Sequence, residues 1–311
     1  MDIFEAKNIE PMLIASESAP FDSDQYLYEL KFDGARAIAY LDGNTTEIRN
    51  KRNKSLTAII PELQNIHTYV NTKVILDGEI IVMKDNLPNF YALQKRTLLT
   101  NPTKISLAST IHPITFICYD ILYWSDTLIT NWPLWKRKNL LAQVIIQQND
   151  RFLCSTVIEN KGIPLFMITK EKGLEGVIAK KKDSLYHFGK RTKDWIKFKN
   201  TIDDDFVVLG YIRKKDGFIS LILGQYSQNQ LQYSGHVTLG VKEQHILSMQ
   251  KKEVASSPLA TIPPGNEKAV WLEPTIVAIV QLIDTADGNF RQPVLKGFRD
   301  DKDPKSCLKK T

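Results

Sequence analysis

What the chain lacks already excludes several protein classes. Only three of its 311 residues are cysteines, Cys118, Cys154 and Cys307, and they lie far apart with no Cys-x-x-Cys pair. This spacing indicates neither a disulfide framework nor a zinc site, and it favours a reducing cytoplasm. The longest apolar runs are only strand-length, and the first residues lack a basic segment followed by an apolar core. We therefore expect a cytoplasmic protein without a membrane span or a signal peptide.

Internal repeats, low-complexity tracts and sustained heptads are also absent, and the length is sufficient for two compact domains. The net charge of +6 suits a polyanionic partner, although such an excess is also common in proteins that bind nothing acidic. The basic residues cluster at 49–54, 180–182, 190–199 and 302–310. Such clusters can hold the backbone phosphates of DNA without reading its sequence.

The most informative pattern is Glu-Leu-Lys-Phe-Asp-Gly-Ala-Arg, from Glu29 to Arg36. A lysine two residues before Asp-Gly and five before an arginine indicates that Lys31 attacks a nucleotide phosphate. An ammonium group cannot attack phosphorus, so neighbouring cations or desolvation must favour the neutral amine. Asp33 can orient polar groups, Gly34 allows backbone and ligand to approach closely, and Arg36 can bind a ribose or a phosphate.

The same segment also fits a β-hairpin, because Asp-Gly is a common turn between strands, here at 26–32 and 35–41. On this segment alone, the two interpretations are equally supported. Further segments decide between them, in the order Arg52-Asn53, Asp77-Gly78-Glu79, Phe116 to Asp120, Glu175 to Lys180 and Trp195 to Lys199. Each also has an ordinary structural interpretation, as a solvated carboxylate at a strand end, a core aromatic residue or the wet face of a strand.

In this order, the segments resemble the motifs of the covalent nucleotidyltransferases, which are ATP-dependent DNA ligases, RNA ligases and mRNA capping enzymes. The segment at 90–96 resembles the Phe-x-x-Leu-Gln-x-Arg segment of ATP-dependent DNA ligases, and 290–302 resembles their last motif, Arg-x-Asp-Lys. The segment at 186–195 is similar to the ligase domains of bacterial end-joining proteins. The resemblance covers nearly the whole chain, which is identified on these motifs as a member of the ATP-dependent DNA ligases.

Periodicity and this resemblance together predict the architecture. Over the first two hundred residues, strands are expected at 25–32, 35–41, 73–83, 114–123, 176–181 and 194–199, and helices at 59–69, 90–96 and 134–148. Short strands follow at 206–212, 218–226, 231–238, 269–273 and 275–283, with a helix at 242–253. Five strands and one helix fit an OB-fold, and by pattern alone an SH3-like barrel nearly as well. The resemblance favours an α+β or α/β nucleotidyltransferase domain of mixed sheets and helices at 1–201, then an OB-fold β-barrel at 202–311, with a hinge near Thr201.

The resemblance also implies ATP and Mg²⁺ or Mn²⁺ as cofactors. It assigns nucleotide binding to Glu29, Lys31, Arg36, Arg52, Glu79, Phe116, Tyr119, Lys197 and Lys199. It assigns catalysis to Lys31, Asp33, Arg36, Lys197, Lys199, Arg299 and Lys302. Glu175 and Glu79 would hold the metal ion. Either Tyr119 or Phe116 would stack on adenine, although the pattern around Phe116 favours a core position.

The implied substrate is nicked duplex DNA, sealed by a monomer, and an end-binding repair protein is a candidate partner. Three alternatives stay open: a capping guanylyltransferase that uses GTP, an RNA ligase, and a catalytically silent DNA-binding module. NAD-dependent ligases are disfavoured, because neither their nicotinamide-recognition domain nor their four-cysteine zinc module is found. The chain is expected to be either a minimal ligase or one domain of a larger protein.

One loop departs from the family pattern. Lys51 and Lys54 stand where the family usually has serine and glycine around Arg52. This loop is therefore expected to be more basic and less tightly turned than in its relatives.

Overall fold

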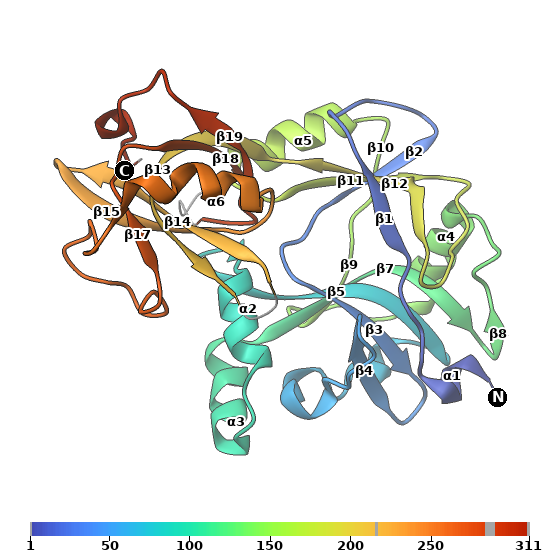
Figure 1. Ribbon diagram of the computed structural model, residues 1–311. Coiled ribbons are helices and arrows are strands. Elements are labelled where there is room, and N and C mark those ends of the chain that lie inside the picture. Colours follow the sequence, from blue (N-terminus) through green and yellow to red (C-terminus); the bar gives the residue numbers. More distant parts are fainter. Residues whose placement is uncertain (1, 215–216, 284–289, 310–311) are drawn as a thin grey trace. The chain divides into compact units, whose positions relative to one another are not determined.

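The protein is described by a computed structural model that covers residues 2–214, 217–283 and 290–309. The chain divides into two compact units, Met1–Lys199 and Asn200–Thr311 (Figure 1).

One sheet of the first unit has the order β1-β12-β11-β2-β10, with β1 parallel to β12 and the other pairs antiparallel. Its strands are β1 (Leu13–Glu17), β12 (Arg191–Lys199), β11 (Gly176–Lys181), β2 (Tyr26–Leu30) and β10 (Ile158–Glu159). Helix α5 (Gly162–Glu171) packs against β11, β2 and β10. The face of the sheet near α5 buries Tyr28, Val177, Ala179 and Phe198.

The second sheet of this unit has the order β4-β3-β5-β7-β8. Its strands are β4 (Thr46–Asn50), β3 (Ala35–Leu41), β5 (Val74–Lys84), β7 (Ile114–Trp124) and β8 (Thr127–Leu128), and β6 (Leu87–Pro88) and β9 (Phe152–Cys154) pair with β5 and β7. Successive side chains of a strand point to opposite faces. In β3, Ala37 and Ala39 therefore join a core on one face, while Ile38 and Tyr40 join a second core that also contains Ile178 and Trp195 of the first sheet. The two sheets thus pack together through this second core.

Helices α1 (Ile3–Ala6), α2 (Phe90–Thr97), α3 (Pro102–Ile111) and α4 (Leu134–Val144) complete the first unit. The side chains of Asn89 and Asn101 accept N-capping hydrogen bonds at α2 and α3. The prediction of one helix at 59–69 was wrong. Three short 3-10 turns lie there instead, η1 (Thr57–Ile59), η2 (Pro61–Leu63) and η3 (Ile66–Tyr69), because Pro61 disfavours a helical conformation at the preceding residue.

The second unit is a β-barrel with one inserted helix. Its strands are β13 (Thr201–Arg213), β14 (Ile219–Ser227), β15 (Gln230–Val237), β18 (Val277–Ile283) and β19 (Val294–Arg299), and α6 (Glu243–Met249) lies between β15 and β18 in the chain. Neighbouring strands pair along β15-β14-β13-β18-β19, and a bridge between Leu239 and Val294 closes the circle. This order confirms the OB-fold and disfavours the SH3-like alternative.

One strand of the predicted barrel was misassigned. The apolar run at 269–273 is β17 (Val270–Leu272), which forms a side branch with β16 (Glu253–Val254) and β13. The fifth barrel strand is β19, which lies within the motif segment 290–302. An η4 turn (Gln250–Lys252) and an η5 turn (Pro304–Ser306) complete this unit.

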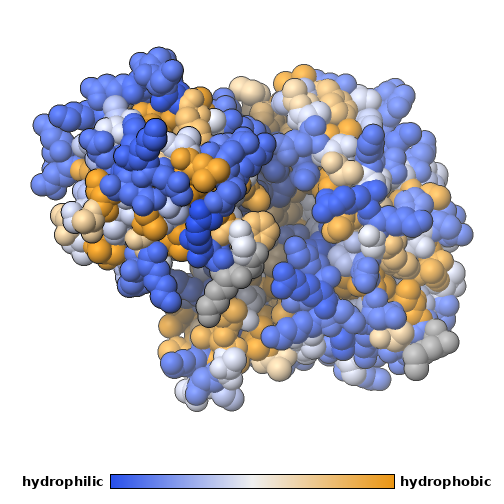
Figure 2. All heavy atoms as spheres, in the orientation of Figure 1, coloured by the Kyte–Doolittle hydropathy of each residue, from blue (hydrophilic) through white to orange (hydrophobic). Residues whose placement is uncertain are grey.

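Hydrophilic residues cover much of the face shown in Figure 2, and hydrophobic residues are interspersed among them. Among the described residues, no helix combines the length and the apolar character that crossing a membrane requires.

Candidate active site

Lys31 lies at the crossover between the two sheets of the first unit. It follows β2 of one sheet, and β3 of the other sheet begins only four residues later, at Ala35. The two strands are not paired with each other, so the hairpin interpretation of Asp33-Gly34 is wrong. The Lys31 backbone N–H donates to the Gly176 carbonyl (2.9 Å), and a side chain at Gly34 would place its Cβ only 2.3 Å from the Ile80 carbonyl oxygen. The crossover is therefore fixed tightly on both sides.

The crossover borders a pocket of about 570 Å³. It is lined by backbone and side chains of both sheets and of the loop after β4: Leu13, Ile14, Glu29, Leu30, Lys31, Phe32, Gly34, Ala35, Arg36, Asn50, Lys51, Arg52, Glu79, Phe90, Tyr119, Ile178, Lys180, Arg191, Trp195 and Lys197. A pocket of this size is within the range that small-molecule ligands occupy.

Strand register explains why motifs far apart in sequence converge here. Leu27, Ile178 and Trp195, on three adjacent strands, all belong to the core between the sheets. Residues two positions away on the same strands point to the same face. Glu29, Lys180 and Lys197 therefore line the pocket, and Ile178 is paired with both Glu29 and Lys197.

The Lys31 amine contacts a buried carboxylate. Its Nζ lies 2.6 Å from Oε1 of Glu175, whose side chain is only 2% exposed. Glu79 also lines the pocket. Burial, with nearby Glu175 and Asp77, raises the pKa of Glu79 to about 7, against the attraction of Arg36 and Lys31. The amine thus lies in a site that contains two carboxylates and a guanidinium.

Arg36 is held rigidly at the pocket wall. It is the cross-strand neighbour of Glu79, and its Nε and Nη2 donate to the two oxygens of Asp77. Tyr186 completes the clamp, because its hydroxyl donates to Asp77 Oδ2 (2.7 Å) and accepts from the Met12 backbone N–H (3.1 Å). Burial opposes the charge of Arg36, but Asp77 raises the arginine pKa well above its usual range. Arg36 is therefore a fixed cation.

The Arg36 guanidinium lies 5.0 Å from the Tyr119 ring centroid, and Lys180 Nζ lies 4.3 Å from the same centroid and 4.4 Å from that of Trp195. These two aromatic rings and two cations form one wall of the pocket.

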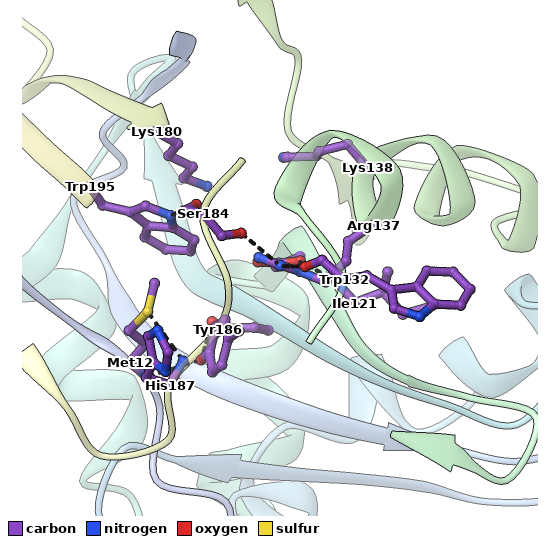
Figure 3. A network of polar contacts seen from close by, with 12 residues as sticks. Met12, Ile121, Trp132, Arg137, Lys138, Lys180, Ser184, Tyr186, His187 and Trp195 are labelled. Atoms are coloured by element: carbon purple, nitrogen blue, oxygen red, sulfur yellow. Dashed lines mark hydrogen bonds and ion pairs between the residues drawn. The ribbon is translucent and has the colours of Figure 1, made fainter. Parts of the chain in front are cut away.

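Beside this wall is an ion cluster that the sequence motifs did not indicate. Burial alone would raise the pKa of Glu29, but Lys138 (2.7 Å) and Lys180 (2.9 Å) together lower it. Burial in turn lowers the pKa of Lys180 to about 8. In Figure 3 the side chains of Lys138 and Lys180 extend toward each other from α4 and β11. Glu29 is therefore a buried carboxylate held by two lysines.

The helix that carries Lys138 is anchored by its neighbour Arg137. The buried Arg137 side chain donates to both oxygens of Asp120 (2.8 Å each) and to the backbone carbonyls of Trp132 and Ser184 (2.5 and 3.1 Å) (Figure 3). The Ser184 hydroxyl in turn accepts from the Trp195 ring N–H (3.3 Å). This network connects α4, β7 and the pocket wall. No sequence motif singled out Lys138 or Arg137.

The structure brings most of the predicted nucleotide-binding residues together, but not all. Phe116 is fully buried, stacks against Phe152 and lies against Gly78, where an added Cβ would come within 2.7 Å of its ring. It does not line the pocket, whereas Tyr119 does. Lys199 does not line it either, and its Nζ pairs with Glu17 (3.1 Å). Asp33 is buried beside Lys31 at the crossover.

The loop after β4 is a hydrogen-bonded turn. The Asn50 side chain accepts from the backbone N–H groups of Arg52 and Lys54 (3.0 Å each), and Asn53 adopts a left-handed conformation. Lys51, Arg52 and Lys54 are exposed, and the first two line the pocket.

Arg299 and Lys302 belong to the second unit. Both donate to Asp205 Oδ2, at 2.9 and 2.8 Å, and Arg299 also forms a bidentate pair with Asp301. Hydrogen bonds to Asp301 and Asp205 raise the pKa of Arg299 above its usual range, and the hydrogen bond to Asp205 raises that of Lys302.

Comparison with known families now decides between the branches of the superfamily. The family model described as "ATP dependent DNA ligase domain" matches residues 11–199, which is more than half of the chain. The chain belongs to the ATP-dependent DNA ligase family. A second model, "ATP dependent DNA ligase C terminal region", matches residues 214–302. These matches confirm the resemblance, the fold and the use of ATP and DNA.

Relatives of this ligase include both short and long proteins. It is 26% identical to "SPbeta prophage-derived DNA ligase-like protein LigB" of Bacillus subtilis (strain 168), over 94% of this chain and 99% of that protein. It is also 26% identical to "Multifunctional non-homologous end joining protein LigD" of Mycobacterium bovis, over 99% of this chain but only 40% of that protein. A solved structure of "mycobacterial DNA ligase D complexed with ATP and MES" shares the fold, with a TM-score of 0.58, 24% identity and coverage of 98% of this chain and 99% of that one.

The raised pKa of Glu79 predicts a pH-dependent stability for this ligase. Between its ordinary pKa of 4.5 and its folded value of about 7, Glu79 binds a proton more tightly in the folded than in the unfolded state. The contribution of Glu79 to the free energy of unfolding is therefore present at the acidic end of this pH window and is lost as the pH rises through it. Glu79→Gln cannot ionise. Its free energy of unfolding, relative to that of the unchanged protein, should therefore rise from pH 5 to pH 8. Because water in the pocket reduces the effect, we expect this rise in relative free energy of unfolding to be about 2 kcal/mol.

Chemical denaturation of both proteins at pH 5 and pH 8 measures this difference. Glu171→Gln, at the exposed end of α5, serves as the matched control and should show no such dependence. A constant difference between Glu79→Gln and the unchanged protein at the two pH values would contradict the shifted pKa.

Proposed function

We propose that the protein seals nicks between a 5′-phosphate and a 3′-hydroxyl in duplex DNA, through an adenylate carried on Lys31. The observation that carries this proposal is the position of the Lys31 amine, at the crossover between two sheets and beside a pocket that also presents Glu79, Arg36 and Tyr119. These groups match the needs of a nucleotide: a nucleophile for phosphorus, donors and acceptors for a ribose, and an aromatic face for a base.

In the first step, Lys31 Nζ attacks the α-phosphorus of ATP, a phosphorus–nitrogen bond forms, and the bond to pyrophosphate breaks. The amine must first lose its proton and leave its contact with Glu175. Lys197 lines the same pocket, and its position suits the α-phosphate. Burial and neighbouring Lys199 lower the pKa of Lys197 itself.

The remaining nucleotide contacts follow from the pocket walls. Arg36 and Glu79, cross-strand neighbours on β3 and β5, suit the ribose hydroxyls, and the Tyr119 ring suits the adenine face. Glu29, held by its two lysines, lines the same pocket, where a carboxylate can accept a hydrogen bond from a base amino group. Phe116, buried in the core, is left out of this assignment.

The donor set fits a divalent metal ion. Glu175 and Glu79 are close enough that the charge of Glu175 raises the pKa of Glu79, and these two carboxylates would hold the ion. In the described parts of the chain, no three acidic, histidine or cysteine side chains gather as a complete metal site. Two carboxylates completed by phosphate oxygens suit Mg²⁺ or Mn²⁺, which would neutralise charge on the phosphates.

In the second step, AMP passes from Lys31 to the 5′-phosphate at the nick, which Arg52 of the exposed loop would bind. In the third step, the 3′-hydroxyl attacks this phosphate and AMP leaves, with Asp33 assigned to the hydroxyl. Arg299 and Lys302 are assigned to the first step, where their charges would orient the leaving pyrophosphate.

Labelling and sealing assays test the proposal against its alternatives. The protein is incubated with Mg²⁺ and either ATP or GTP, and then with a nicked duplex whose 3′ side carries deoxyribonucleotides or ribonucleotides. We expect sealing with ATP and with the all-DNA duplex. Labelling with GTP alone would indicate a capping enzyme, a requirement for ribonucleotides would indicate an RNA ligase, and DNA binding without labelling would indicate a silent module.

We further propose a role in DNA repair by end joining, supported by the similarity to LigD proteins, which are described as multifunctional end-joining proteins. The chain matches 40% of that relative's length, and we propose an end-binding repair protein as its partner at broken ends. Sealing of a blunt or cohesive break, with and without a protein that binds duplex ends, tests this role against simple nick sealing.

The exposed loop predicts a measurable salt effect. Lys51 and Lys54 lie on either side of Arg52 and face solvent. If they contact DNA phosphates, Lys51→Gln with Lys54→Gln should weaken binding to a nicked duplex and reduce the log–log salt slope by up to about two units. Binding measured over a salt series checks this.

The matched control neutralises Lys170 and Lys172, two exposed lysines at the end of α5 that do not line the pocket. An unchanged slope and affinity after substitution of Lys51 and Lys54 would show that these charges are only solvated.

A further inference from the structure

The barrel contains a carboxylate that joins two cations of the proposed mechanism. Asp205 lies on β13, and its side chain is 13% exposed. A single oxygen, Oδ2, accepts from Arg299 Nη1 (2.9 Å) and from Lys302 Nζ (2.8 Å). Neither the sequence motifs nor the family resemblance assigned a role to Asp205.

The strand order explains how this contact forms. Arg299, at the end of β19, pairs in register with Val277 of β18, and Val277 pairs with Val207 of β13. Asp205 is two residues before Val207 and thus on the same face of β13. The Arg299 side chain therefore reaches across β18 to Asp205, while Lys302 arrives from the turn after β19.

Without a shared acceptor, two cations side by side would repel each other and their long side chains would sample many rotamers. Asp205 offsets the repulsion and fixes both donors. Asp301 also binds the Arg299 guanidinium, but the Asp301 side chain is 64% exposed. Within the described residues, Lys302 forms its hydrogen bond with Asp205 and none with Asp301. Of the two carboxylates, Asp205 is the one that brings both cations together.

We propose that Asp205 is a positioning residue for the adenylation step, which holds Arg299 and Lys302 as one preorganised pair for the pyrophosphate group of ATP. This inference rests on the proposed role of the two cations. Preorganised donors lower a barrier because no reorganisation is needed when charge develops on the leaving group. Asp205 would thus act on the nucleotide only through its two partners.

The test uses Asp205→Asn, which keeps the shape of the side chain and removes its charge. Two reactions of the full chain are compared: labelling of the protein by ATP, and sealing of nicked DNA that already carries the 5′-adenylate. We expect adenylation to fall about tenfold, because misplaced donors lose part of their effect. The KM for pyrophosphate in the reverse reaction, release of ATP from the adenylated protein, should rise. Sealing of adenylated DNA should stay unchanged.

Three further variants make the result decisive. Asp203→Asn removes the same charge two residues away on the same face of β13. Asp203 is exposed and contacts neither cation in the described part of the chain. This variant should have no effect on adenylation. Asp205→Glu should restore part of the rate. In a protein that already carries Arg299→Ala and Lys302→Ala, Asp205→Asn should cause no further loss of adenylation.

Unchanged adenylation in Asp205→Asn, or an equal loss in both reactions, would overturn the inference, as would a full additional loss in the variant without the two cations. If Arg299→Ala with Lys302→Ala itself left adenylation unchanged, the role proposed for the cations would fail instead. If that variant lost adenylation while Asp205→Asn did not, only the positioning role of Asp205 would fail.

Discussion

Lys31→Ala is expected to abolish labelling of the protein by α-labelled ATP, while binding to nicked DNA persists. The reason is chemical: the adenylate is a bond to Lys31 Nζ, and the pocket offers no other amine at the crossover between the sheets. The other lining lysines, Lys51, Lys180 and Lys197, belong to the exposed loop, to the Glu29 ion cluster and to β12. Labelling is measured on a denaturing gel after exposure to ATP and Mg²⁺, and DNA binding by fluorescence anisotropy.

Lys31→Arg keeps the positive charge of the side chain but removes the nucleophilic amine. It keeps a cation beside Glu175 but cannot form the phosphoramidate under the same conditions. It should fold as the unchanged protein does and remain unlabelled. Lys170→Ala, an exposed residue of α5, should label normally. Labelling of Lys31→Ala at another residue would show that the nucleophile has been assigned to the wrong lysine.

Arg299→Ala combined with Lys302→Ala should reduce labelling by ATP by about 10²- to 10³-fold, because two charged donors to the leaving pyrophosphate are removed. Sealing of DNA that already carries the 5′-adenylate should be largely retained, since no pyrophosphate is present in that reaction. Single-turnover rates of the two reactions measure this split.

The matched control for this pair combines Arg213→Ala with Lys305→Ala, which removes the same charges from exposed positions of the second unit. It should leave both rates unchanged. Equal losses in labelling and in sealing after substitution of Arg299 and Lys302 would mean that these residues support the barrel or DNA binding, and not pyrophosphate release.

Patterns that repeat along a strand were predictable from sequence, and contacts between strands were not. The apolar runs that became β3, β5, β7 and β11 were located to within one or two residues, because strand periodicity is a local property. The helix expected at 59–69 failed at Pro61, and the fifth barrel strand was misassigned because β17 and β19 are both short. Which short strand closes a barrel depends on distant pairing partners.

The candidate site shows the same limit. The motifs located Lys31, Arg36, Glu79 and Tyr119, all of which line the pocket. They gave no sign of Lys138, whose helix sequence has no special pattern, because its role arises only from the fold that places it 2.7 Å from Glu29. Tyr186 was noted as part of a motif, but its hydrogen bond to Asp77, 109 positions away in the chain, could not be inferred from spacing.

A pulse-chase experiment shows whether an adenylate on Lys31 is the intermediate of DNA sealing. The protein is labelled with α-labelled ATP, freed of nucleotide, and mixed with nicked duplex DNA and Mg²⁺ in a single turnover. The proposed mechanism predicts that the label leaves Lys31, identified by peptide mass spectrometry, appears on the 5′ end at the nick, and is released as AMP as the sealed strand forms. Sealing without transfer of the label, or label that stays on the protein in the presence of the nick, would contradict it.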